Sequence, residues 1–135
     1  MGYFQTLITV SEDCPISQNA VPQPLRGKET VACIQYRLLS GAPYRMTEEE
    51  LLFRVYCIQN NIPEHAEDRQ QLWDTFFSTP KACLRSSPLP KKHGWGIHYD
   101  ADGKIALYGI ESDMYQKLLA DETVAKRKGM RSARV

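Results

Sequence analysis

The hydrophobic pattern begins with a short run that is typical of a β-strand. Residues 3–10, YFQTLITV, are rich in the β-branched and aromatic side chains that favour strands. The segment that follows, SEDCPISQNAVPQPLRGKE, contains three prolines and several small polar residues, which indicate a loop. Because this loop is long for a connection without secondary structure, we expect it to pack along the surface or beside a site.

Three helices are predicted in the middle of the chain. Within residues 30–40, Val31, Ile34 and Leu38 recur at helical spacing, and Gly41 is suited to the position just after the helix end. The pattern therefore predicts a first amphipathic helix that closes before the GAPYRM segment.

The second and third helices have clearer start signals. Thr47 can cap the second helix, and Glu50, three residues later, completes a capping box. Asn61 is the expected cap of the third helix, with Pro63 in its first turn and Pro80 as its stop. The apolar residues near the end of this third helix are expected to be buried: Leu72, Trp73, Phe76 and Phe77.

From residue 81 onward the pattern changes to that of strands. Residues 81–89, KACLRSSPL, are predicted as a short strand or extended segment, and residues 95–110 as a β-hairpin. Ser112 is the expected cap of a last helix, and a short strand near Val124 is possible before a basic end.

Two turn registers fit the hairpin. A two-residue turn at Asp102-Gly103 would pair Ile97 with Tyr108, whereas a three-residue loop with Gly103 in the left-handed region would pair Ile97 with Leu107. We favour the three-residue loop because it gathers the apolar side chains on one face. That face would carry Trp95, Ile97, Tyr99, Ile105 and Leu107, and the opposite face Gly96, His98 and Tyr108.

The order of these elements predicts one α+β domain over residues 1–135. Its sheet is expected to be mainly antiparallel, with a C-terminal β-hairpin at about residues 95–110, about four helices, and a basic C-terminal tail at residues 124–135. The length of 135 residues suits a single domain with a substantial core.

Composition and charge exclude several classes of protein. The chain is 42% hydrophobic and 24% charged, as in soluble globular proteins, and no apolar run approaches the ~18 residues of a membrane span. The net charge of +1 gives no reason to expect nucleic acid as a partner. No secretory signal precedes the first strand, and the four cysteines lack metal or disulfide-framework spacing, so we expect reduced thiols in the cytoplasm.

Metal and thiol chemistry receive little support from the sequence. His93 and His98 are five residues apart, a spacing that places side chains on opposite faces of a strand. No further ligands complete a recognised metal set, and nothing indicates a cofactor. Cys83 precedes a cationic Arg85 but lacks a catalytic signature, so we predict no metal site and assign no catalytic residue.

Anion binding is the most specific chemical prediction. The segment at residues 83–96 concentrates guanidinium, ammonium and hydroxyl groups, which bind phosphate or carboxylate, beside an indole face. The alternative is a solvated basic loop whose tryptophan belongs to the core. The candidate residues for a small anionic or phosphorylated ligand are Arg85, Ser86, Ser87, Lys91, Lys92 and Trp95.

The basic tail supports a second hypothesis, a protein-interaction module without catalysis. Its charges could attract an acidic partner, or an exposed sheet edge could pair with one. The five positive residues within nine positions are Lys126, Arg127, Lys128, Arg131 and Arg134.

Several segments are similar to a family of small uncharacterised proteins classed as a domain of unknown function. The most specific are CLRSSPL, GWGIH and GKIALYG, and TLITVSEDCP, LLFRVY and RKGMRSARV also resemble it. The similarity covers nearly the whole chain. It implies a soluble single-domain protein and supplies no activity, cofactor, substrate or catalytic residue.

Overall fold

The computed structural model describes residues 2–132. Its elements follow in the order β1 (Thr6–Thr9), α1 (Val31–Gly41), α2 (Glu48–Gln59), α3 (Arg69–Phe76), the 3₁₀ helix η1 (Leu84–Ser86), α4 (Pro88–Lys92), β2 (Trp95–Tyr99), β3 (Ile105–Gly109), α5 (Asp113–Ala120) and β4 (Ala125–Lys128). The predicted α+β class is confirmed.

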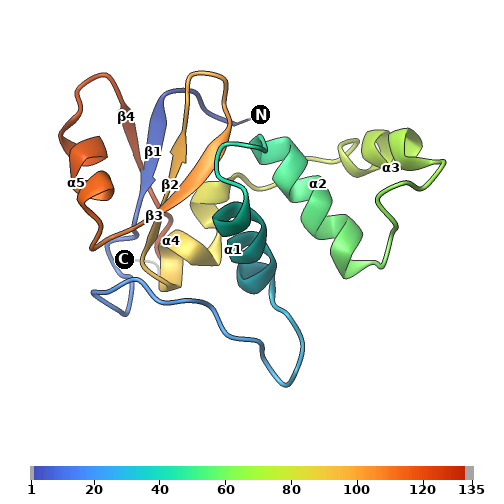
Figure 1. Cartoon of the computed structure of the whole chain (residues 1–135), viewed down its shortest axis with the longest axis horizontal. Coiled ribbons are helices and arrows are strands. Elements are labelled where there is room, and N and C mark those ends of the chain that lie inside the picture. Colours follow the sequence, from blue (N-terminus) through green and yellow to red (C-terminus); the bar gives the residue numbers. More distant parts are fainter. Residues whose placement is uncertain (1, 133–135) are drawn as a thin grey trace.

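The four strands form one mostly antiparallel sheet in the order β3-β2-β1-β4 (Figure 1). β2 pairs antiparallel with both β1 and β3, whereas β4 runs parallel to β1. The first and the last strand of the chain therefore lie side by side, with β4 at the edge of the sheet.

The predicted hairpin register is confirmed. Ile97 lies opposite Leu107 and Tyr99 opposite Ile105, with a loop between them in which Gly103 has φ +80°. The Asp100 carboxylate accepts hydrogen bonds from the backbone N–H groups of Asp102 and Lys104, at 2.9 Å each.

Helices cover both faces of the sheet. α1, α2 and α4 lie on one side and α5 on the other (Figure 1). The larger core cluster lies under α1 and α2: Ile8, Ile34, Leu39, Leu51, Val55, Leu84, Ile97, Tyr99 and Ile105. A smaller cluster lies under α5: Leu7, Tyr115, Leu118 and Val124.

Two of the predicted helix caps are confirmed. The Thr47 hydroxyl accepts from the Glu50 N–H at 3.3 Å, and the Ser112 hydroxyl accepts from the Tyr115 N–H at 3.1 Å. Both satisfy an N–H group that has no partner within its own helix. Gly41 is the last residue of α1 rather than the residue after it.

The predicted start of the third helix is wrong. α3 begins at Arg69. Asn61 does not cap a new helix, because it adopts a left-handed conformation (φ +54°) just after the end of α2. The backbone N–H of Ile62 donates to the Cys57 carbonyl at 2.9 Å and closes α2. The aromatic side chains of α3 are half-buried, and no α3 residue is fully buried.

The predicted strand at residues 81–89 is also wrong. This segment forms η1 and α4, where the Ser87 hydroxyl accepts from the Leu89 N–H at 3.2 Å and Pro88 occupies the first helical position. The fourth strand is β4, beyond α5, next to Val124, where the sequence analysis allowed a short strand. Within the described residues, no helix is long and apolar enough to cross a membrane.

Candidate functional site

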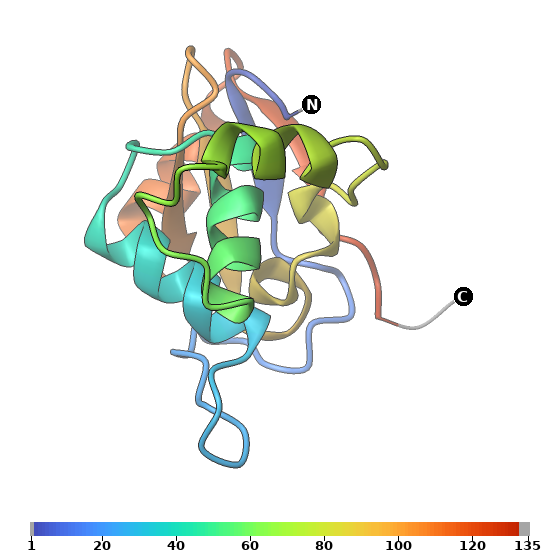
Figure 2. The same cartoon turned by 90° about the vertical axis from the view of Figure 1, so that its right-hand side faces the viewer.

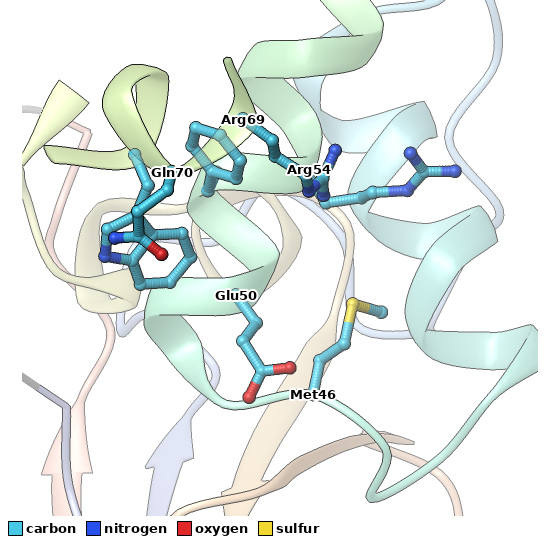
Figure 3. Close-up of a pocket in the computed structure, with 7 residues that line it drawn as sticks. Met46, Glu50, Arg54, Arg69 and Gln70 are labelled. Carbon is cyan, nitrogen blue, oxygen red and sulfur yellow. The ribbon is translucent and has the colours of Figure 1, made fainter. Parts of the chain in front are cut away.

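A cavity with a volume of about 530 Å³ lies between α2 and α3. In Figure 3, Arg69 and Gln70 approach it from α3, Glu50 and Arg54 from α2, and Met46 from the segment before α2. Phe53 and Trp73 complete its wall. Three of its lining side chains are apolar and four are polar or charged, and its volume is in the range of small-molecule sites.

Aromatic contacts hold α3 against α2. The centroid of the Phe53 ring lies 5.0 Å from that of the Trp73 ring and 5.8 Å from that of the Phe76 ring, and both contacts are edge-to-face. α3 lies across the upper part of α2, near the N-terminus of the chain (Figure 2). Phe53 and Trp73, which make one of these contacts, also form part of the cavity wall.

Arg69 is the residue in this cavity with the clearest unmet interaction. Its guanidinium carbon lies 5.1 Å from the centroid of the Phe53 ring, within cation–π range. Its Nη1 atom is buried and has no hydrogen-bond partner in the described part of the chain. A buried donor of a charged group without an acceptor is costly, and an anion in the cavity would supply that acceptor.

The other polar groups in the wall are already partnered. Arg54 forms an ion pair with Glu64, and the Gln70 amide donates to Asp74 at 3.0 Å. Glu50 accepts from the Thr47 hydroxyl at 3.2 Å. These contacts hold the three side chains in place. Arg69 is the polar side chain in this wall that has a buried atom without a hydrogen-bond partner among the described residues.

A second cavity of about 280 Å³ adjoins the first, and both have Glu50 and Trp73 in their walls. It lies between the start of α2, the N-terminal segment and the hairpin turn. Its other lining residues are Gly2, Tyr3, Phe4, Thr47, Glu48, Glu49, Asp102 and Gly103.

Glu48 is a buried carboxylate on the wall of this second cavity, with 1% of the residue exposed. Its Oε1 accepts from the Tyr99 hydroxyl at 2.8 Å and from the Leu84 N–H at 2.9 Å. Burial and the nearby Glu48 charge raise the pKa of the Tyr99 hydroxyl, which therefore stays protonated and donates. Oε2 is buried and has no partner among the described residues.

Tyr3 and Cys83 extend this polar cluster. The Tyr3 ring packs edge-to-face on Tyr99 at 5.4 Å, and its hydroxyl donates to the Cys83 sulfur at 3.7 Å. Burial, followed by the hydrogen bond to Cys83, raises the pKa of Tyr3. All four cysteines are free thiols, and no group of three metal-ligating side chains occurs in the described part of the chain.

The six residues predicted for anion binding do not share any one of the cavities described here. The Arg85 Nε donates to the Lys128 carbonyl at 2.7 Å. Ser86 and Ser87 line a cavity of about 250 Å³, where the Ser87 hydroxyl donates to Gln35 at 2.6 Å and the Ser86 hydroxyl donates to a backbone carbonyl.

The remaining three candidates lie elsewhere. Lys91 and Lys92 form the last turn of α4. Trp95 lines a separate cavity of about 280 Å³, donates from its indole to the Ala20 carbonyl at 2.8 Å, and packs on Tyr36. Anion binding at residues 83–96 stays a prediction.

A second polar cluster lies at the β3 edge of the sheet. The Tyr44 hydroxyl lies 2.7 Å from His98 Nδ1 and 2.8 Å from the Tyr108 hydroxyl. Burial lowers the pKa of His98 and raises that of Tyr44. With the His98 proton on Nε2, Nδ1 accepts from Tyr44, which accepts from Tyr108.

The basic tail begins as strand β4 and then follows the surface. Glu12 forms ion pairs with Lys128 and Arg131, and the Asp13 carboxylate accepts from the Ser132 N–H. These cations lower the pKa of Glu12. The last basic residue of the tail, Arg134, lies outside the described residues.

Sequence reasoning missed Arg69 and Glu48. Arg69 fell in the interior of the longer third helix that was predicted, and Glu48 received no prediction beyond its place after the Thr47 cap. One signal was available for Glu48: Tyr99 was predicted to face the core, and a buried tyrosine hydroxyl requires a partner. No comparable signal identified Arg69.

The fold and the two cavities define a small α+β protein with a ligand-sized groove along α2. The chain belongs to a family of unknown function, DUF6157, whose model matches residues 1–135. The predicted resemblance to an uncharacterised family is thereby confirmed. No curated protein and no solved structure matches the chain.

Proposed function

We propose that this domain binds a small organic anion, a carboxylate or a phosphate monoester with an apolar or aromatic body, in the cavity between α2 and α3. The observation that carries the proposal is the Arg69 guanidinium, whose Nη1 is buried without an acceptor beside a cavity of about 530 Å³. The ligand class is the one expected from the sequence. The position differs from the predicted segment at residues 83–96.

The lining of the cavity supports this ligand class. The anionic group would accept hydrogen bonds from Arg69, which the Phe53 ring holds in place. The apolar body would pack on Met46, Phe53 and Trp73. Glu50, at the opposite end of the wall, would exclude an anion from that end by charge repulsion.

The test is a thermal-shift screen with inorganic phosphate, nucleoside monophosphates and aromatic carboxylates. At roughly tenfold excess over Kd a ligand stabilises the folded state by about 1.4 kcal/mol, which raises Tm by about 2–6 °C. Arg69→Gln should abolish the shift. Arg37→Gln is the matched control, because Arg37 is exposed and paired with Glu29.

Arg85→Gln separates the two possible positions. If binding occurs at Arg69, Arg85→Gln should keep the full shift. A shift lost in Arg85→Gln and kept in Arg69→Gln would locate the anion at residues 83–96 instead. The absence of a shift with every anion at millimolar concentration would overturn the proposed function.

A further inference from the structure

Glu48 is an unusual residue for the first turn of a surface helix. A glutamate at this position ordinarily extends into water, where the helix dipole stabilises its charge. Here the residue is 1% exposed, and its Oε1 already accepts from Tyr99 and Leu84. The second oxygen, Oε2, is buried and has no hydrogen-bond partner among the described residues.

The unpartnered oxygen belongs to a side chain in the wall of the second cavity. Glu48 and Gly2 both line it, and a Cβ placed on Gly2 would lie 3.5 Å from Oε2. Gly2 therefore borders this oxygen without a side chain of its own. Burying a carboxylate oxygen without a donor is unfavourable, and a ligand that brings an N–H group would remove that cost.

The rest of the wall indicates the charge of that ligand. Glu50 and Asp102 add carboxylates at the rim, and the described lining residues include no lysine or arginine. Three aromatic rings, those of Tyr3, Phe4 and Trp73, supply apolar and π surfaces. Carboxylates combined with aromatic faces are the chemistry that binds organic cations.

We propose that the cavity beside Glu48 binds a small organic cation, an ammonium or amidinium group on an aromatic or apolar body. Glu48 Oε2 accepts a charge-assisted hydrogen bond from the cation, while Tyr99 and Leu84 hold the carboxylate in place. The aromatic rings contact the ligand body. This site differs from the anion site at Arg69 and does not depend on it.

The experiment is a calorimetric titration of the full chain with benzamidinium and with phenethylammonium. The matched neutral probe is benzamide, which has nearly the same shape as benzamidinium and lacks its charge. We expect benzamide to bind about 10- to 100-fold more weakly than benzamidinium, because the charge-assisted hydrogen bond is lost. Equal affinities for benzamide and benzamidinium, or no binding of either cation at millimolar concentration, would overturn the proposal.

Variants assign the binding to this carboxylate. Glu48→Gln should weaken benzamidinium binding about 10- to 100-fold, whereas Glu122→Gln, an exposed charge-matched control, should not change it. The anion screen is judged with Arg69→Gln and the benzamidinium titration with Glu48→Gln, so that failure of the anion site and failure of the cation site are distinguishable. Wild-type affinity in Glu48→Gln contradicts the proposal.

Two further readouts apply if Glu48→Gln does not fold. Asp102→Asn changes an exposed rim residue and should weaken binding about 2- to 5-fold. In the wild-type chain, the Leu84 amide resonance should shift on titration, because this N–H donates to the Glu48 carboxylate. An unmoved Leu84 resonance at saturation places the cation elsewhere.

Discussion

Buried polar side chains in this domain depend on partners that lie far away in the sequence. Tyr99 and Glu48 are 51 positions apart, and the Tyr99 hydroxyl donates to the Glu48 carboxylate at 2.8 Å. Tyr44 and His98 are 54 positions apart, and the Tyr44 hydroxyl lies 2.7 Å from His98 Nδ1. At the scale of single residues, these groups are where pH and substitution should act most clearly, because the low dielectric of the interior penalises any change of charge.

His98 should make the domain less stable in mild acid. Burial lowers its pKa, so the unfolded chain binds the proton more readily, and stability is complete above the unfolded value near 6.5 and falls as pH decreases toward the folded value. His93, whose pKa burial and Lys92 also lower, acts in the same direction. The urea midpoint should therefore decrease between pH 7 and pH 5 (roughly the window set by these histidines).

Substitutions of the two histidines test their separate contributions. His98→Gln and His93→Gln should each reduce the pH dependence, and the double variant should remove most of it. The lowered pKa values of Glu12, Glu29 and Asp121 affect stability only at more acidic pH, because those carboxyls titrate below the window. An unchanged pH dependence in the double variant contradicts this assignment.

At the scale of elements, α5 packs very closely on the sheet because β2 has a glycine beneath it. A Cβ on Gly96 would lie 2.5 Å from a ring carbon of Tyr115 and 3.2 Å from the Ile8 carbonyl oxygen. The Tyr115 hydroxyl accepts from the Val10 N–H at 3.0 Å, so its ring cannot move without loss of that bond. The close approach makes Gly96 a structural requirement for this face.

Gly96→Ala should destabilise the domain by about 1–3 kcal/mol, since the added methyl group overpacks the contact with Tyr115. Gly41→Ala is the matched control, because no atom lies within 4 Å of its added Cβ and its φ is not positive. That variant should be neutral or stabilise by about 0.4–1 kcal/mol. The comparison requires urea unfolding of both variants, and equal stabilities would contradict the packing argument.

Elements with local signals were predicted well from the sequence. The alternation along residues 95–109 and the single glycine of the turn determine which faces match, and the register followed from them. The caps at Thr47 and Ser112 are contacts within four residues. The segment at residues 81–89 was predicted as a short strand or extended segment. Its serines and prolines also suit a short capped helix, and packing decides between the two.

At the scale of the whole molecule, the first and the last strand of the chain pair with each other at one side of the sheet. β4 pairs in parallel with β1, the Gly129 N–H donates to the Thr9 carbonyl at 2.9 Å, and the Met130 N–H donates to the Arg85 carbonyl at 2.8 Å. Residues 125–130 are therefore bonded into the domain, although the side chains of β4 are exposed.

Truncation should distinguish the structural part of the tail from its end. Removal of residues 125–135 should lower Tm strongly and promote aggregation, because it leaves the β1 edge unpaired and Val124 less covered. Removal of residues 131–135 should cost less than about 1 kcal/mol, since the contacts of the described residues 131 and 132, such as that of Arg131 with Glu12, are exposed. Equal stabilities of the two truncations would contradict this division.

The shorter truncation also tests the hypothesis of a protein-interaction module. If an acidic partner binds the basic residues after β4, a chain without residues 131–135 should fold and lose the partner. If the partner pairs with the exposed β4 edge, the same chain should keep it. Retention together with loss on charge reversal at Lys126 would indicate that the strand itself is the interaction surface.

The sequence by itself determined the α+β class, the hairpin with its three-residue loop and two helix caps. These follow from periodicity and from contacts within a few residues, which one stretch of chain specifies alone. Only the tertiary structure decided that Glu48 is buried, that Arg69 lacks an acceptor, and that both face cavities along α2. Each of these features depends on packing between segments that are distant in sequence. The free energy of that packing cannot be inferred from the pattern of a single segment.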